Sequence, residues 1–413
     1  MKYAFLVFPF IFFVPQAAFA ALQNFGGFEA GSAPAEHSII SNSSVQSSIV
    51  KNGTYAYRAN PSTTNTGAVT IFPYAADGAT TNAIACTNPC SIGFWFRADT
   101  IPASLEEQML DFQNNAGGIG YLTLESDGQI GLYDASPAAG IGTSTTALSS
   151  GTWYFIELQV SGGATAAYEL KIDGVSQFSG TRSFDAGTIR AISLGKRTNR
   201  NGQTVDFYYD DFYMNDSSYI TNARNSKVLA MVPNATGGTY TAFAAGTNSS
   251  NFAEADEIPN DSDTTYVKST NADEAVAFGM QNTSAVGISG TILGMRAVAR
   301  LRDETGTSIN SLRIRSGATD NDTTARDPGA SYASTQKVYE TDPATSAAWT
   351  TSGLDAVEVG ATDGAGSSVR IRLTAAYAMV YFTPAAATET AVTAKNKFVG
   401  GVIRFLGGAF RFN

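Results

Sequence analysis

The feature that most constrains this chain is a series of short alternating or apolar runs between about residue 68 and residue 215. Clusters of Gly, Asn, Asp and Ser separate the runs at the spacing expected of a β-sandwich. No long stretch has a helical period, and parallel strands would need crossover helices. The pattern predicts antiparallel strands at residues 68–74, 91–97, 108–112, 120–125, 129–133, 153–161, 168–172, 189–194 and 204–214.

Two Asp-Gly pairs give this pattern local support. Asp127-Gly128 lies between two alternating runs, and Asp173-Gly174 repeats the arrangement further along the chain. Asp-Gly readily adopts the positive φ that a tight hairpin turn requires. We therefore expect a hairpin at each pair.

Four motifs, in order, give the first half of the chain a family resemblance. They are SIGFWFR at 91–97, GTWYFIEL at 151–158, LKIDG at 170–174 and YYDDF at 208–212. Together they resemble the laminin-G-like branch of the concanavalin A-like lectins. The resemblance covers the chain to about Asp216 and implies a two-sheet antiparallel jelly roll, with Trp95 and Trp153 filling the core between the sheets. Members of this family bind glycans, proteins or calcium, and many bind nothing known.

The second half of the 413-residue chain reads as a separate β-rich domain. A polar stretch at 219–227 is typical of a linker, and the second domain is expected at 228–384. Its best predicted strands are 228–232, 275–280, 288–301, 311–315, 356–360 and 369–382. The predicted fold class is all-β: an antiparallel concanavalin A-like jelly-roll sandwich at 21–218, followed by a second β-sandwich-like domain.

The chain also resembles structural proteins of tailed bacteriophages that join a laminin-G-like roll to a second β domain. This resemblance rests on VLAMVP at 228–233, DEIP at 256–259, DTTYV at 263–267, and DP at 342–343 followed by AWT at 348–350. It implies a virion component with a tail or capsid-decoration role. Phage structural proteins normally carry no export signal, whereas the N-terminus of this chain has the pattern of one.

Residues 1–20 have the features of a signal peptide. Lys2 precedes an apolar run, and Ala18-Phe19-Ala20 is the small-x-small exit that signal peptidase requires. We expect a mature chain from Ala21 that is secreted, held at the cell envelope or displayed on a virion. The apolar run is too short for a comfortable membrane span, so we expect no transmembrane span after signal removal. An uncleaved anchor and a misassigned start are the alternatives.

Charge and cysteine content limit the partners. The formal net charge of −10 would repel a polyphosphate, so nucleic acid is not an expected partner. The two cysteines, Cys86 and Cys90, are candidates for a disulfide because export allows one to persist. Two thiolates alone do not complete a tetrahedral zinc site.

The residues that catalysis would need are scarce. The sole histidine, His37, lies in a polar segment and gives no triad. A glucanase would need paired carboxylates at alternating positions of one strand, but Glu106 and Glu107 are adjacent, and Glu125 and Asp127 flank a turn. The prediction is a protein that does not catalyse, with a degenerate glucanase-like hydrolase as an alternative.

Two groups of aspartates offer calcium as a cofactor, although no cofactor is required by the sequence. Asp206, Asp210 and Asp211 can supply oxygen ligands, or Asp210 and Asp211 can accept hydrogen bonds from loop amides. The cluster Asp256, Asp261 and Asp263 can likewise supply calcium ligands, or it can form a solvated turn. No Asp-x-Asp-x-Asp-Gly loop is present.

Sugar binding needs an aromatic platform beside polar groups at a loop rim. The candidate ligand-binding residues are Tyr133, Tyr154, Tyr208, Tyr209 and Phe212, and strand alternation must turn about half of them into the core. The predicted function is binding or adhesion through a lectin-like roll, with a glycan or a cell-surface or virion protein as partner. Homo-oligomerisation stays open, because no heptads occur.

The last stretch, residues 385–413, combines an Ala/Thr linker with a Gly/Phe/Arg tail. Two interpretations are open for this tail. It can add a final strand to a sheet edge, or it can act as an anchoring or oligomerising peptide.

Overall fold

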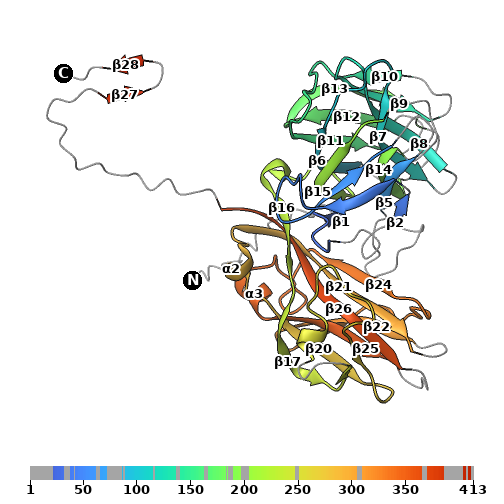
Figure 1. Cartoon of the computed structure of the whole chain (residues 1–413), viewed down its shortest axis with the longest axis vertical. Helices are drawn as coiled ribbons and strands as arrows, with labels where there is room; N and C mark the ends of the chain where they lie inside the picture. The colour runs from blue at the N-terminus through green and yellow to red at the C-terminus, as the bar shows by residue number, and fades with distance from the viewer. Residues whose placement is uncertain are drawn as a thin grey trace, which may run out of the picture.

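The computed structural model describes residues 22–31, 38–40, 42–61, 66–71, 86, 89–114, 117–135, 140–161, 166–182, 184, 189–196, 204–246, 251–304, 309–364, 370–385, 403–405 and 408–410. These residues form two β-sandwich domains, one above the other in Figure 1. Every strand pair among them is antiparallel, as the alternating pattern predicts. The predicted signal segment, Ala21 and His37 lie outside the described residues.

The first sheet of the N-terminal jelly roll has the strand order β13-β12-β11-β6-β15-β4-β3, and β1 also pairs with β15. Its strands are β1 (Leu22–Gly26), β3 (Ser43–Gln46), β4 (Ala56–Ala59), β6 (Cys90–Ala98), β11 (Tyr154–Val160), β12 (Ala166–Ile172), β13 (Val175–Arg182) and β15 (Phe207–Asn215). We call it the eight-stranded sheet. The β12–β13 hairpin turns at the predicted Asp173-Gly174 pair, where both residues have positive φ.

The second sheet of the jelly roll has the order β10-β9-β8-β7-β14-β5-β2. Its strands are β2 (Ser38–Ile40), β5 (Gly67–Ile71), β7 (Glu107–Asn114), β8 (Gly117–Leu124), β9 (Ile130–Asp134), β10 (Gly140–Thr143) and β14 (Ala191–Lys196). We call it the seven-stranded sheet. The second predicted hairpin joins β8 to β9, where the Gln129 amide donates to the Asp127 carboxylate at 2.9 Å.

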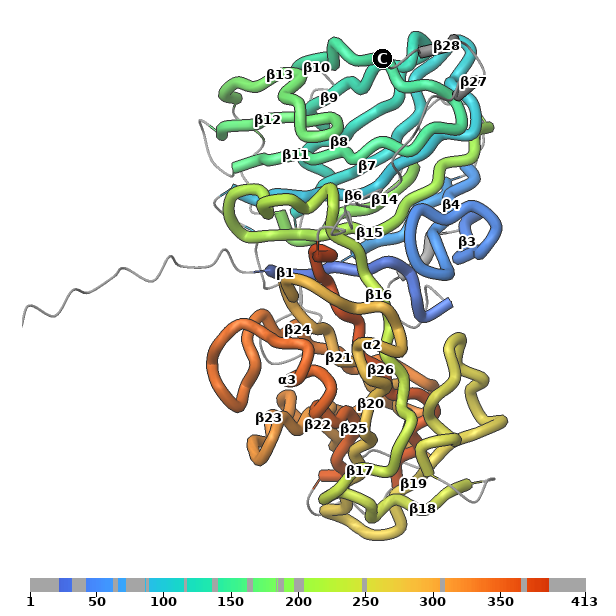
Figure 2. The backbone as a smooth tube through the Cα atoms, turned by 90° about the vertical axis from the view of Figure 1, so that its left-hand side faces the viewer, coloured from blue at the N-terminus to red at the C-terminus, as the bar shows by residue number. Residues whose placement is uncertain are grey.

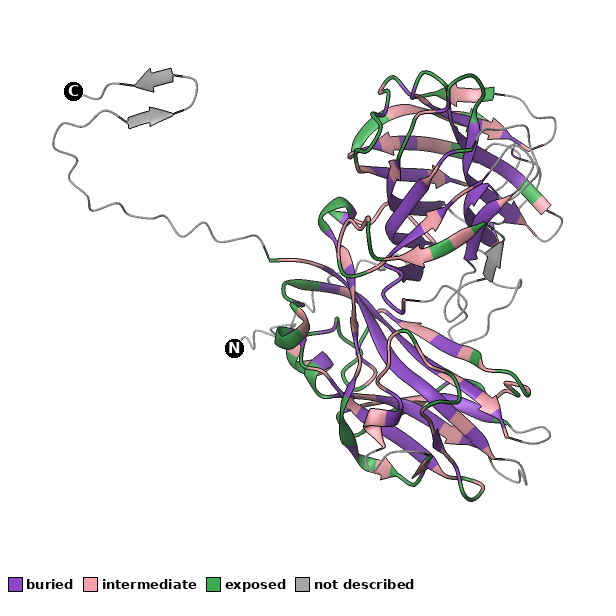
Figure 3. Ribbon diagram, in the orientation of Figure 1, coloured by how far each residue is buried: buried purple, intermediate pink, exposed green. Residues whose placement is uncertain are grey.

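The core of the jelly roll lies between these two sheets, and Figure 3 shows the buried residues concentrated there. Phe94 and Phe96 of β6 fill it, together with Tyr209 of β15. The prediction that Trp95 and Trp153 fill this core is wrong. Because neighbouring side chains of a strand alternate between faces, Trp95 points to the outer face of the sheet, and Trp153 precedes β11 and packs beside that face.

The second domain begins after the turn of η1 (Ala223–Asn225) and also contains two sheets. One holds β16 (Lys227–Met231), β18 (Ala244–Ala245), β19 (Val267–Lys268), β21 (Thr291–Asp303), β24 (Ala333–Tyr339) and β26 (Ile371–Thr383). The other holds β17 (Pro233–Thr241), β20 (Ala275–Met280), β22 (Asn310–Ser316), β23 (Thr319–Asp322) and β25 (Val357–Asp363). Short helices η2 (Phe252–Glu254), α2 (Thr283–Val286) and α3 (Thr351–Asp355) lie in the connections. None of the described helices is long and apolar enough to cross a membrane.

The two domains share a buried interface, with β1 lying between them and β16 leading into the second domain (Figure 2). The outer face of the eight-stranded sheet contributes Phe25, Phe155 and Tyr213, and β26 contributes Tyr377 and Tyr381. Tyr381 stacks on Phe25 and on Tyr213, with ring centroids 5.5 and 6.3 Å apart. The alternation of β26 thus gives one row of side chains to its own domain core and the other row to the neighbouring domain.

The remaining predicted features fall at the edges of the fold. Cys86 and Cys90 form a disulfide, with Cα atoms 5.0 Å apart. In the C-terminal tail, β27 (Ile403–Phe405) pairs with β28 (Gly408–Phe410) as a hairpin of its own. The described part of the tail therefore pairs with itself and not with a sheet edge of either domain.

Candidate functional site

A row of polar side chains crosses the outer face of the seven-stranded sheet. Strand pairing places Thr70 of β5 opposite Ser193 of β14, and Ser193 opposite Asp111 of β7. Asp111 is in turn opposite Tyr121 of β8, which is opposite Tyr133 of β9. We call these five residues the polar row. It brings together segments up to about 120 residues apart in the sequence.

The next row of the same strands points inward. Val69, Leu194, Leu110, Leu122 and Leu132 are cross-strand neighbours and belong to the core between the sheets. Since adjacent residues of a strand face opposite sides, the polar row must lie on the side away from this core. Because the alternate residues of these strands are apolar and form the core, the polar residues between them lie on the outer face.

Hydrogen bonds hold the Ser193 end of the row. The Ser193 hydroxyl accepts a bond of 2.7 Å from the Gln113 amide and lies 2.9 Å from the Thr70 hydroxyl. The Gln108 amide donates to the Asp111 carboxylate at 3.2 Å. Thr70, Ser193, Asp111 and Tyr121 are buried, and Tyr133 is half-buried. The part of the row that solvent reaches is therefore its Tyr133 end.

At that end, an aromatic ring and a carboxylate lie side by side. Tyr133 stacks on Tyr121, with centroids 5.3 Å apart and planes inclined by 7°. Its hydroxyl donates to Glu125 Oε1 at 3.1 Å, and the Thr123 hydroxyl donates to the same oxygen at 2.6 Å. Glu125 is half-buried. We call Tyr121, Thr123, Glu125 and Tyr133 the Tyr133 site.

Local sequence explains this geometry. Glu125 opens the Asp127-Gly128 hairpin, which returns the chain so that β9 lies beside β8. Gly131 lies opposite Thr123 in this pairing. A Cβ atom at residue 131 would come within 2.3 Å of Glu125 Oε1 and 2.6 Å of the Tyr133 ring. A glycine is therefore required at this position for the carboxylate and the phenol to meet.

The Tyr133 phenol is protonated at neutral pH. Burial, followed by the negative charge of Glu125, raises the pKa of Tyr133 to about 12. The site thus presents a hydroxyl that donates, a carboxylate that accepts and an aromatic ring that is partly open. Such a set can hold a sugar ring by stacking and hydroxyl bonding, and the protonated phenol can act as a general acid toward a bound group.

The structure separates the five residues predicted to bind a ligand. Tyr133 lies in the site just described, whereas Tyr209 and Phe212 are fully buried in the jelly-roll core. Tyr208 is buried beneath Arg97 on the eight-stranded sheet, and the Tyr154 hydroxyl accepts a bond from the Ser149 amide at 3.1 Å. The five candidates therefore do not lie together, and strand alternation turns Tyr209 and Phe212 into the core, as expected for about half of the set. Tyr121 and Glu125, which complete the site, were not predicted as ligand residues.

The three aspartates predicted as calcium ligands have other partners. Asp206 forms an ion pair with Arg58 at 2.8 Å. Asp210 accepts from the Lys51 and Asn52 amides at 2.8 and 3.0 Å, and Asp211 accepts from the Val228 amide at 2.8 Å. The alternative interpretation, amide capping, matches these bonds. Among the residues that the structure describes, no group of three or more His, Cys, Asp and Glu side chains is arranged to hold a metal ion.

The buried pair Asp210 and Asp211 makes stability depend on pH. Burial raises the pKa of Asp211 to about 7 from 3.8, and burial together with the charge of Asp211 raises the pKa of Asp210. Between these pH values the folded chain binds protons that the unfolded chain has released, so the free energy of unfolding falls as pH rises from about 4 to about 7. Denaturant titrations across this range measure the slope. Asp211→Asn should flatten it, and an unchanged slope would contradict the assignment.

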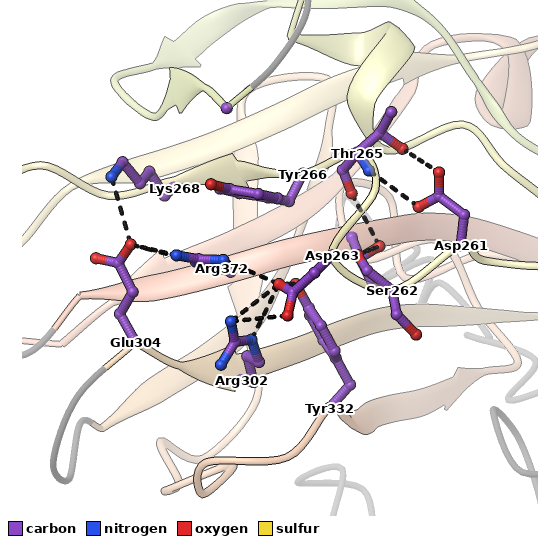
Figure 4. A network of polar contacts seen from close by, with 12 residues as sticks. Asp261, Ser262, Asp263, Thr265, Tyr266, Lys268, Arg302, Glu304, Tyr332 and Arg372 are labelled. Atoms are coloured by element: carbon purple, nitrogen blue, oxygen red, sulfur yellow. Dashed lines mark hydrogen bonds and ion pairs between the residues drawn. The ribbon is translucent and has the colours of Figure 1, made fainter.

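Asp261 and Asp263 of the second aspartate cluster lie in a network of polar contacts on the second domain, and Asp256 is not part of it (Figure 4). Asp263 accepts from Arg302 at 2.9 Å, Arg372 at 3.0 Å and the Tyr332 hydroxyl at 2.9 Å. Arg372 also pairs with Glu304 at 2.8 Å. The Thr265 amide and hydroxyl both donate to Asp261, as expected of a turn. The network holds the 261–266 segment against β21 and β26, and its cations are already matched by carboxylates.

The similarity of this chain to known proteins is distant. No protein-family model matches the sequence, and no curated protein sequence matches it. Among solved structures, similarity extends to an endo-β-1,4-glucuronan lyase from the fungus Trichoderma reesei, with 14% identity, a TM-score of 0.36, and coverage of 47% of this chain and 95% of the lyase. The cellulose-induced protein Cip1 gives 12% identity and a TM-score of 0.38, with coverage of 48% and 99%.

A carbohydrate esterase of the Shiga toxin-encoding bacteriophage phi24B is similar in the same way. Its identity is 14% and its TM-score 0.35, and the match covers 48% of this chain and all of the esterase. The proteins named in these matches are jelly-roll-like β-sandwich proteins, several of which carry carbohydrate-active names. The laminin-G-like branch within that class stays a prediction.

The prediction of a protein that does not catalyse is contradicted. The similar structures include enzymes, among them the glucuronan lyase, sialidases, an alginate lyase and the phage esterase. A glucanase-type pair of carboxylates and a histidine triad are only two of the residue sets that act on carbohydrates, so their absence does not exclude catalysis.

Proposed function

We propose that this chain is a carbohydrate-active protein that engages a glycan at the Tyr133 site. The observation that carries the proposal is the partly open Tyr133 ring, fixed on Tyr121 and bonded to the Glu125 carboxylate. Aromatic faces stack on the apolar faces of sugars, and carboxylates accept bonds from sugar hydroxyls. Tyr121, a buried member of the polar row, packs against the Tyr133 ring and fixes its position.

A chemical step on the bound glycan is the second candidate. It is favoured by the Tyr133 phenol, which keeps its proton at neutral pH and can give it to the leaving oxygen of a glycosidic bond while Glu125 takes a proton from the attacking water. The hydrogen bond between the two groups then returns that proton from Glu125 to the phenolate. Incubation of the chain with polysaccharides, followed by chromatography of the released oligosaccharides, tests this step. Product that disappears in Tyr133→Phe would support the role of the hydroxyl, whereas product that persists would remove it.

The test of binding is the substitution Tyr133→Ala. Loss of the stacking surface should weaken glycan affinity about tenfold or more, equal to about 1.4 kcal/mol, in affinity electrophoresis or calorimetry. Tyr240→Ala is the matched control, since Tyr240 is a half-buried tyrosine on the second domain, stacked on Arg313. Equal affinities of wild type and Tyr133→Ala would refute the proposed site.

We also propose that the protein works outside the cytoplasm, either secreted, at the cell envelope or on a virion surface. Two features support this: the signal-like residues 1–20 and the Cys86–Cys90 disulfide, which persists in oxidising compartments. Mass spectrometry of fractionated culture should find an N-terminal peptide that begins at Ala21 in the supernatant or envelope. An intact N-terminus in sedimented particles would instead favour the virion component.

A further inference from the structure

The charges around the Tyr133 site have one sign. Glu125 belongs to the site, Asp111 lies two strands from Tyr133 in the polar row, and Glu106 is close enough for its charge to raise the pKa of Tyr133. The described outward-facing residues of this sheet are Ala68, Thr70, Gln108, Asp111, Gln113, Gly118, Tyr121, Thr123, Gly131, Tyr133, Gly140, Thr143, Ala191 and Ser193. None of these described residues is a lysine, arginine or histidine.

The cations of the neighbouring described strands are engaged elsewhere. Lys196, at the end of β14, is fully buried and lies 3.8 Å from Glu107. Arg182 of β13 pairs with Asp134 at 3.2 Å. Lys196 and Glu107 occupy positions that alternate with the outward-facing rows, and Arg182 belongs to the other sheet. Neither cation therefore offsets the carboxylates of the Tyr133 site.

The hydrogen-bonding groups of the site also favour a ligand that donates hydrogen bonds. Glu125 Oε1 already accepts two protein bonds, and a carboxylate has about four acceptor positions on its two oxygens. The groups that best fill the remaining positions are hydroxyls, which neutral sugars carry in number. A sugar carboxylate at the same place brings a second negative charge into a half-buried site, where like charges repel more strongly than in bulk water.

We infer that the glycan taken at the Tyr133 site is a neutral, hydroxyl-rich polysaccharide and not a polyuronate or sialylated chain. This inference rests on the proposed function. It goes further by naming the class of ligand. The overall net charge of −10 also repels an anionic polysaccharide at longer range.

The experiment uses pairs of polysaccharides that differ only at C6: a glucan, a mannan and a galactan, each with its C6-oxidised polyuronate. Affinity for the full chain is measured by affinity electrophoresis at two salt concentrations. We expect at least one neutral polymer to bind about tenfold or more tightly than its oxidised partner, with a gap that narrows as salt screens the repulsion. Glu125→Gln should narrow the gap, and Asp327→Asn, an equal charge change on the second domain, should leave it unchanged.

The outcomes separate this inference from the proposed function. Tighter binding of a polyuronate that depends on Tyr133 would overturn the neutral class and keep the site. Binding that ignores Tyr133→Ala would refute the site itself, and the same holds if none of the six polymers binds. A preference for neutral polymers that Glu125→Gln does not change would also overturn the inference, because the selection would then not come from this carboxylate.

Discussion

Lys196→Met should destabilise the jelly roll by about 3–5 kcal/mol, because it leaves the Glu107 carboxylate in the core without the charge of its buried partner. Both side chains are at most 1% exposed, and Lys196 Nζ lies 3.8 Å from Glu107 Oε1. Removing one member of a buried pair costs more than the pair contributes, since the remaining charge is not solvated. Denaturant unfolding followed by the fluorescence of the tryptophans, two of which (Trp95 and Trp153) lie in the jelly-roll domain, measures the loss.

The double variant Glu107→Leu with Lys196→Met is the matched control. Replacing both charges by apolar groups of similar volume should recover most of the lost stability, because no unpaired charge remains. A double variant as unstable as the single one would show that the pair has other essential contacts. A single variant within about 1 kcal/mol of wild type would contradict the account of a buried ion pair.

Tyr381→Ala should uncouple the two domains. The Tyr381 ring is fully buried and stacks on Phe25 and Tyr213 across the interface, so its removal costs about 3–5 kcal/mol as an unfilled cavity. Wild type should unfold in one calorimetric transition, because an apolar interface of this kind joins the domains into one cooperative unit. The variant should show two transitions.

Tyr381→Phe keeps the ring and should retain the single transition. Arg296 also joins the two domains at this interface. Its fully buried guanidinium donates to the Asn24 side chain at 2.9 Å and lies over the Phe25 ring. Two transitions already present in wild type would show that the domains unfold independently, which would contradict the coupling.

Much of the fold follows from periodicity. The apolar and alternating runs of the jelly roll match strands such as β6, β8 and β11 within a few residues, and both Asp-Gly pairs form hairpins as predicted. Where both faces of a strand are buried, periodicity does not reveal which face packs in the core of its own domain and which packs against the other domain. Trp95 has the hydrophobicity of a core residue and is buried, but it is buried near the domain interface and not between the two jelly-roll sheets.

The candidate site was predicted only in part, for the same physical reason. Tyr133 was one of five aromatic candidates for a sugar-binding rim, and it is half-buried. Tyr209 and Phe212 carry the same chemistry but face the core, and no local signal distinguishes them. The polar row depends on cross-strand register among five strands, which a sequence alone does not give. Gly131 was the one local signal, since a glycine within a strand often marks close approach by another group.

Backbone hydrogen exchange with and without glycan tests the central claim most directly. The full chain is exchanged in the presence of the tightest-binding polymer of the C6 panel, and peptides are compared by mass spectrometry. The account predicts slower exchange in peptides covering residues 117–135, which hold β8, the hairpin and β9, and no change in β21 or β26 of the second domain. Protection confined to the second domain, or unchanged exchange across 117–135 while the polymer is bound, would contradict it.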